Sequence, residues 1–267
     1  MRRLLLPCLL SLLWSPALLA APVAKPVEWK IGSDTFSGYL VYDDDFDGAT
    51  DRPGIVMFPN WMGVTEEAVS RAKAVADDDY IVLLADVYGE DVRPRNPQEA
   101  GAATQAAYAN RPLLRERAAV AVDVLRRHGN IAMLDKDRIG AIGFCFGGAV
   151  ALELARAGAD LDGDVSFHGN LETTMAAQPG VMKTPVLVLN GADDTFVSPA
   201  SITAFGQEMR AVGADWQFVD FGGAMHCFAE PSADGVAVPG CKYDERAATR
   251  AYRMMGSFFS ERFKEAD

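Results

Sequence analysis

Residues 143–148 have the sequence Gly-Phe-Cys-Phe-Gly-Gly and join the apolar run 138–142 to a stretch of helix-forming residues. This order of strand, abrupt turn and helix matches the G-x-S-x-G nucleophile elbow, with sulfur in place of oxygen at Cys145. The elbow strains the backbone of its nucleophile, so the flanking residues Gly143 and Gly147 need small side chains. The N-terminus of the following helix favours a thiolate. The same pattern also fits a buried cysteine in a nucleotide-binding fold, so the rest of the chain must distinguish the two.

The chain alternates apolar strands with helices, and no repeat or linker interrupts the alternation. We expect an antiparallel hairpin first, over residues 27–31 and 36–42. Further strands are predicted at 54–58, 80–85, 139–142, 164–167, 185–189 and 216–220, and helices at 65–76, 98–110, 113–128, 149–157, 202–212 and 243–263. Continuous apolar strands separated by helices predict the α/β class, with a mostly parallel sheet covered on both faces. Functional residues of such sheets lie at the carboxyl ends of the strands.

The beginning of the chain has a different pattern. Arg2 and Arg3, an apolar stretch and a series of small residues together predict a signal peptide over residues 1–20. Cleavage after Ala20 would leave 21–267 as a single domain, exported to the periplasm or secreted. The alternative is an uncleaved anchor, but the apolar stretch is short and is interrupted by prolines.

The composition narrows the partners of the protein. A net charge of −12 predicts repulsion from nucleic acid and from anionic membranes. No later stretch is long enough to span a membrane, so no membrane partner is expected after cleavage. Cys-x-x-Cys and His-x-x-x-His spacings are absent, so we expect no metal, and no motif calls for a cofactor. No pattern indicates a particular oligomeric state.

Three chemically suitable residues follow predicted strands in the order Cys145, Asp194, His226. This is the α/β-hydrolase order of nucleophile, acid and histidine. A thiol needs a base to ionise at neutral pH, and the imidazole needs a carboxylate to fix its tautomer. Asp193 and Asp194 are adjacent, and either one fits that role while the other holds the turn. His168 also ends a strand, where it either lines the pocket or makes a structural hydrogen bond.

These motifs together resemble the dienelactone hydrolase family of α/β-hydrolases. The turn 143–148 matches the family's G-x-C-x-G-G pattern. Residues 191–197 look like its acid loop, in which the aspartate two positions before a Phe-Val pair is catalytic, and 224–229 look like its histidine loop. The resemblance covers almost all of the predicted domain and implies that Asp194, rather than Asp193, is the acid.

The resemblance also implies a mechanism. Cys145 would attack the carbonyl of an ester or lactone to give an acyl-enzyme, His226 would carry the proton, and water would release the acid. The oxyanion would be held by the backbone amides of Phe146 and Trp61.

One position departs from the family. The better-known members have a glutamate that helps to deprotonate the cysteine, and the matching residue here is Asn60, whose amide cannot accept a proton. Ionisation of Cys145 then falls to His226, and dienelactone itself is disfavoured as a substrate. For Arg93 and Arg95 the alternatives are pairing with a substrate carboxylate, as arginines of the family do, and solvation at the surface.

Three cysteines remain once the leader with Cys8 is removed. A nucleophilic Cys145 must stay reduced, and an exported protein meets an oxidising compartment, so we predict a disulfide between Cys227 and Cys241. A loop of that length is stabilised by about 3 kcal/mol in the chain-entropy model. The competing pair is Cys145 with Cys227, which would inactivate the enzyme and act as a redox switch.

The sequence therefore favours an exported, cysteine-dependent hydrolase of ester, lactone or thioester bonds in small molecules. The alternative is a non-catalytic or redox-responsive ligand-binding protein on the same fold, since a fold does not fix a function. Turnover that disappears in Cys145→Ala separates the two hypotheses.

Overall fold

A computed structural model of the chain describes residues 22–44, 51–77, 79–128 and 133–264. The predicted signal peptide lies outside these ranges. The strands are β1 Val23–Ile31, β2 Asp34–Tyr42, β3 Arg52–Phe58, β4 Ile81–Leu84, β5 Leu134–Phe144, β6 Gly163–Phe167, β7 Val186–Gly191 and β8 Trp216–Phe221. The helices are α1 Glu66–Ala76, α2 Pro97–Ala109, α3 Arg111–His128, α4 Phe146–Arg156, α5 Pro199–Val212 and α6 Glu245–Arg262.

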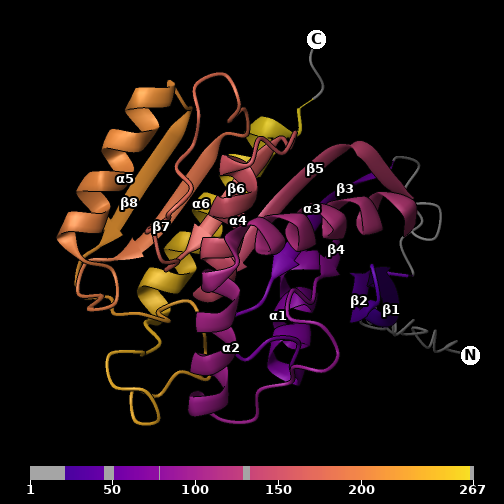
Figure 1. Cartoon of the computed structure of the whole chain (residues 1–267), viewed down its shortest axis with the longest axis horizontal. Helices are drawn as coiled ribbons and strands as arrows, with labels where there is room; N and C mark the ends of the chain where they lie inside the picture. Colours follow the sequence, from indigo (N-terminus) through magenta and orange to yellow (C-terminus); the bar gives the residue numbers. More distant parts are fainter. Residues whose placement is uncertain (1–21, 45–50, 78, 129–132, 265–267) are drawn as a thin grey trace, which may run out of the picture.

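All eight described strands form one sheet in the order β1-β2-β4-β3-β5-β6-β7-β8 (Figure 1). β1 and β2 pair antiparallel, and β2 joins the edge of β4 antiparallel. From β4 to β8 every neighbouring pair is parallel. The predicted α/β-hydrolase fold, with its N-terminal hairpin and mostly parallel sheet, is confirmed.

Helices cover both faces of the sheet because successive strand side chains alternate in direction. Val56 of β3 packs into the core cluster that also contains residues of α3 and α4, whereas Ile55 and Met57 pack into the cluster of α1 and α6. α5 covers the first of these faces near β7 through Phe205 and Met209. Among the described residues, no helix is long and apolar enough to cross a membrane.

Local sequence signals set the helix starts. Thr65, Asn96, Ser198 and Asp244 have extended backbones, and the side chain of each accepts a hydrogen bond from a backbone N–H in the first turn of its helix. Such caps satisfy donors that the helix itself leaves unpaired. The predicted helix start at Thr65 is thus matched by its capping bond.

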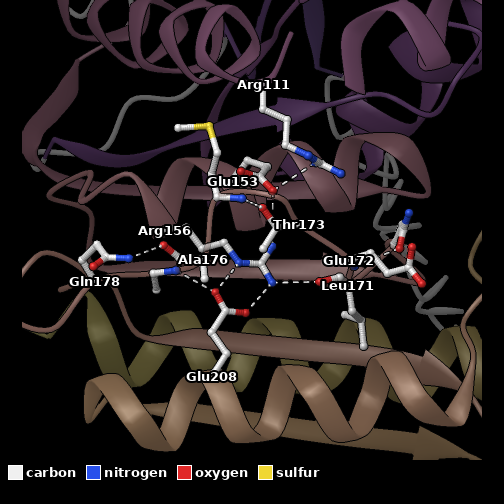
Figure 2. Close-up of polar contacts among 12 residues, drawn as sticks. Arg111, Glu153, Arg156, Leu171, Glu172, Thr173, Ala176, Gln178 and Glu208 are labelled. Atoms are coloured by element: carbon white, nitrogen blue, oxygen red, sulfur yellow. Dashed lines mark hydrogen bonds and ion pairs between the residues drawn. The ribbon is translucent and has the colours of Figure 1, made fainter. Parts of the chain in front are cut away.

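A buried ionic cluster ties α4 to its neighbours (Figure 2). Glu153 of α4 accepts from Arg111 Nη1 at 3.1 Å and from Arg115 Nε at 2.8 Å, both on α3. Arg156 donates to both oxygens of Glu208 on α5, at 3.0 and 2.9 Å. We call these five residues the α4 cluster, and they fix the helix that begins directly after Cys145.

Candidate active site

The elbow at the end of β5 has the backbone that its glycines permit. Cys145 is the N-cap of α4 with φ 54° and ψ −115°, a strained conformation for a residue with a side chain. A Cβ at Gly143 would lie 2.0 Å from the carbonyl oxygen of Gly147, and one at Gly147 would lie 2.1 Å from that of Phe58. Any larger residue at either position would therefore push the elbow apart.

The histidine and acid loops bring their side chains to the sulfur. His226 Nε2 lies 3.1 Å from Cys145 Sγ, and His226 Nδ1 lies 2.7 Å from Asp194 Oδ2. The other oxygen of Asp194 accepts from Phe196 N at 2.7 Å, so this carboxylate is fixed in orientation. Asp193 is exposed, and its side chain makes no hydrogen bond to the imidazole. The structure thus places Asp194, not Asp193, beside His226.

The electrostatics of the site favour a protonated imidazole. Burial alone would lower the pKa of His226, but the charge of Cys145 and the hydrogen bond to Asp194 outweigh it and raise that pKa to about 10. At neutral pH the ring therefore carries a proton between a carboxylate and the sulfur.

His168 lies behind the elbow and is fully buried. Its Nδ1 accepts from the backbone N–H of Cys145 at 3.1 Å, which leaves Nε2 to carry the proton of the neutral ring. Burial, followed by the charges of His226 and Arg71, holds the pKa of His168 well below its usual range. His168 therefore supports the backbone of the elbow as a neutral side chain. Of the two predicted roles, the structural hydrogen bond is the one that its contacts show.

The two amides expected to hold an oxyanion sit on either side of the elbow. Phe146 N belongs to the first residue of α4, and Trp61 N belongs to the turn after β3. Among the described residues neither amide has a hydrogen-bond acceptor. The turn itself is fixed, because Gly63 N donates to Asn60 O at 2.9 Å and Tyr88 Oη donates to Trp61 O at 3.0 Å.

Comparison with known proteins places this geometry in a family. The model of the dienelactone hydrolase family matches residues 36–263. The chain belongs to the dienelactone hydrolase family. As a member it is a hydrolase that acts on ester bonds.

Solved structures and sequence relatives agree with this assignment. A dienelactone hydrolase-like promiscuous phosphotriesterase from metagenomic libraries is 36% identical with a TM-score of 0.84, over 91% of this chain and 99% of its own. The structure named m3DLH is 33% identical with a TM-score of 0.85, over 92% and 100%. An uncharacterised protein of Caenorhabditis elegans is 34% identical over 152 residues, which are 56% of this chain and 94% of that protein.

In this member of the dienelactone hydrolase family, the two arginines considered for substrate binding pair with acidic residues away from the elbow. Arg93 pairs with the buried Asp86 at 2.9 Å and donates to Ser37 Oγ. Arg95 has an 87% exposed side chain and lies 3.8 Å from Glu99. The structure brings neither guanidinium to the elbow through any recorded contact.

Aromatic residues lie next to the elbow and the His226 ring instead. No motif in the sequence indicates two of them, Tyr88 and Tyr108. Tyr88 stacks on Phe146 with ring centroids 5.2 Å apart, and Tyr108 meets the same ring edge-on at 5.5 Å. Burial raises the pKa of both tyrosines, and the charge of Cys145 adds to each shift. Phe196 lies 4.8 Å from the His226 ring and is half exposed. Phe146 is therefore packed against two tyrosines, and Phe196 presents exposed aromatic surface beside His226.

The cysteines are divided as the sequence predicts. Cys227 and Cys241 form a disulfide, and Cys145 is free. No group of three or more His, Cys, Asp or Glu side chains in the described ranges is placed to hold a metal ion. The alternative pairing of Cys145 with Cys227 is not the one present.

Asn60 has a partner that its position in the sequence does not reveal. Its Nδ2 donates to Glu230 Oε2, and Arg71 donates to the same oxygen at 3.0 Å. Glu230 follows His226 by four residues, and that spacing is the one sequence signal that links it to the site.

Proposed function

We propose that this protein is an exported, cysteine-dependent hydrolase that cleaves ester, lactone or thioester bonds of small molecules through an acyl-enzyme on Cys145. The observation that supports it most is the 3.1 Å approach of His226 Nε2 to Cys145 Sγ, with Asp194 behind the ring. A nucleophile, a base and an orienting acid in contact are the requirements of covalent acyl transfer.

The reaction follows from these positions. The sulfur adds to the carbonyl carbon, and the carbonyl oxygen gains the negative charge next to the amides of Trp61 and Phe146. Collapse breaks the bond to the leaving oxygen or sulfur, which takes the proton from His226. Water then loses a proton to His226 and adds to the thioester, and the second collapse returns the thiolate and releases the carboxylic acid.

The surface around Cys145 supports substrates with an uncharged, apolar body. Phe196 supplies exposed aromatic area beside His226, and Tyr88 and Tyr108 pack against Phe146 of the elbow, while Arg93 is held by Asp86. Arg93 and Arg95 pair with acidic residues away from the elbow, so neither is placed to bind a substrate carboxylate there. We therefore expect aryl and alkyl esters to be accepted more readily than dienelactone.

Export is supported by the leader pattern of residues 1–20 and by the disulfide, since disulfides persist in oxidising compartments. The proposal takes residues 21–267 as the mature single domain. Mass spectrometry of the protein recovered from the periplasm or medium would show whether cleavage follows Ala20.

Hydrolysis of p-nitrophenyl acetate by the purified protein tests the activity. Cys145→Ala and His226→Ala should each lower turnover by several orders of magnitude, because both remove a reacting group. His128→Ala is the matched control, since His128 ends α3 and its Nδ1 contacts Val124 O. Full activity of Cys145→Ala would exclude the proposal, and ligand binding without turnover in the wild type would favour the non-catalytic alternative.

A further inference from the structure

Glu230 places a buried carboxylate between the loops that carry the site. It is 3% exposed and lies on the segment after His226, and its backbone N–H donates to Cys227 O at 2.9 Å. Burying a carboxylate is costly unless it is paired and hydrogen-bonded. The partners of Glu230 therefore indicate what it holds in place.

One oxygen of Glu230 reaches the turn after β3. Asn60 Nδ2 donates to Glu230 Oε2, while Asn60 Oδ1 accepts from Met62 N at 3.0 Å. The two ends of the Asn60 amide thus join Glu230 to the peptide on the far side of Trp61. The turn that presents Trp61 N is fastened from both sides.

The charge of Glu230 is balanced by Arg71 of α1. Arg71 Nη2 lies 3.0 Å from Glu230 Oε2, and its guanidinium lies 4.7 Å from the centre of the Phe144 ring, one residue before the nucleophile. Arg71 is buried as well. The pair therefore has a fixed geometry, because neither side chain has solvent to move into.

The second oxygen of Glu230 faces His168. Glu230 Oε1 lies 4.0 Å from His168 Nε2, and neither atom has a hydrogen-bond partner among the described residues. His168 in turn accepts from Cys145 N. We call Asn60, Arg71, His168 and Glu230 the site cluster.

We propose that Glu230 is a positioning residue that acts through Asn60 to hold the Trp61 amide where the oxyanion forms. The inference rests on the proposed function. Position 60 has no carboxylate in this chain, but Glu230, from the segment after His226, brings one next to it. We infer that this carboxylate orients the turn that carries Trp61 N and does not deprotonate the thiol.

A carboxylate suits this role better than an amide. Glu230 Oε2 accepts from Asn60 and Arg71 together, which needs a strong acceptor. In Glu230→Gln the arginine loses its countercharge, and an amide group turned toward it would oppose one donor with another. The Asn60 turn should then shift, and a displacement of about 1 Å at a catalytic group can cost up to about 100-fold in rate.

Two rates separate this role from activation of the thiol. Acylation by p-nitrophenyl acetate needs the oxyanion amides, and it is read as the burst of p-nitrophenolate. Alkylation of Cys145 by iodoacetamide needs the thiolate but forms no oxyanion. In Glu230→Gln and in Asn60→Ala we expect acylation to fall by about 10- to 100-fold, KM to change little, and alkylation to stay within about twofold.

The double variant gives a second criterion. If Glu230 acts through Asn60, Glu230→Gln with Asn60→Ala should be no slower than the worse single variant, because coupled residues are not additive. Glu208→Gln is the matched control, a glutamate in a buried ion pair with Arg156 on another part of the fold. It should lower the melting temperature but leave the acylation rate of the folded protein unchanged.

Several results would overturn the proposal. Equal loss of acylation and alkylation would assign Glu230 to the thiol, and unchanged acylation would remove any role. Additive loss in the double variant would separate Glu230 from Asn60. If Glu230→Gln does not fold, the half-buried Asn60→Ala decides alone. A wild type with normal alkylation and no ester turnover would instead reject the proposed function, and this inference with it.

Discussion

The α4 cluster and the site cluster, both buried Glu–Arg groups of the described residues, differ in how completely their carboxylate oxygens accept hydrogen bonds. In the α4 cluster both oxygens of Glu153 and both oxygens of Glu208 accept hydrogen bonds (Figure 2). In the site cluster one oxygen of Glu230 and Nε2 of His168 have no partner within the described ranges. Each cluster also has an arginine nitrogen without a hydrogen-bond partner among the described residues, Arg111 Nε and Arg156 Nη1 in the first and Arg71 Nε in the second, so the difference lies in the acceptors. Buried acceptors are almost always paired, and the unpaired oxygen of Glu230 therefore marks a place where stability is not the only requirement.

The comparison separates scaffold from site by physical criteria. The α4 cluster joins α3, α4 and α5, and its carboxylates are used up within the fold. The site cluster joins loops that carry Trp61 and His226, and it includes a histidine that accepts a hydrogen bond from the backbone of Cys145. We therefore expect substitutions in the first to change stability and substitutions around the second to change turnover.

Asp194→Asn should give the largest effect and the clearest difference between the two regions. An amide cannot stabilise the charged His226 ring and can select the wrong tautomer, so kcat should fall by about 10⁴-fold. Steady-state kinetics and thermal unfolding of the same sample would test this. Asp193→Asn is the control, because Asp193 is exposed, and a larger loss there would transfer the acid role to it.

Glu153→Gln should have the opposite profile. It leaves Arg111 and Arg115 without their shared countercharge, and loss of one partner of a buried ion pair costs about 3–5 kcal/mol of unfolding free energy. Urea unfolding should show that loss, while kcat per folded molecule stays the same. Glu116→Gln, at an exposed position of α3, should change stability by less than about 0.5 kcal/mol. A drop in kcat with unchanged stability would erase the distinction between the clusters.

Removal of the disulfide should loosen the loop that carries Glu230 before the rest of the fold. Cys227 and Cys241 enclose Glu230 in a loop with a sequence separation of 14, and loss of such a bond costs about 3 kcal/mol in the chain-entropy model. The double variant Cys227→Ala with Cys241→Ala should lose activity at a lower temperature than it loses the signal of the helices. Simultaneous loss of both signals would show that the loop is not a separate unit.

The fold could be predicted from the sequence because its signals are local. Apolar strands, capping residues and the glycine elbow each act within a few residues, and the predicted elements match the observed ones apart from their ends. β5 begins at Leu134 rather than near Ile139, because its first residues pair with Arg52 and Pro53 of β3. That pairing depends on a partner strand about 80 residues away, so no local pattern announces it.

Site residues that belong to a sequence motif could be predicted, whereas those that reach the site only through tertiary contacts could not. Cys145, Asp194 and His226 stand in motifs, and the structure brings them together. Asn60 and Glu230 are 170 positions apart, and apart from its place four residues after His226 nothing around Glu230 distinguishes it from a surface acid. Arg93 looked available because its partner Asp86 is visible only once the loop is folded.

The smallest expected effect at neutral pH concerns the proton on His226, and it becomes large only in alkali. An unfolded histidine has a pKa of about 6.5, whereas the folded ring has a pKa of about 10. The native state therefore binds this proton more tightly, and the stability it contributes is complete below pH of about 6.5 and lost as the pH rises through about 10.

The groups that face the ring fix the sign of this shift. Burial disfavours the charged imidazole, but Cys145 and Asp194 outweigh it, and the neighbouring His168 is neutral. We expect kcat/KM for p-nitrophenyl acetate to be level from about pH 7 to 9 and to fall near pH 10, as the imidazolium that protonates the leaving group is lost. Asp194→Asn should move that fall to lower pH, because one of the charges that raise the pKa is gone. Glu153→Gln should leave the pH of that fall unchanged, since no residue of the α4 cluster bonds to His226. A fall near pH 6.5 in the wild type would show that the charge of Cys145 does not hold the proton on His226.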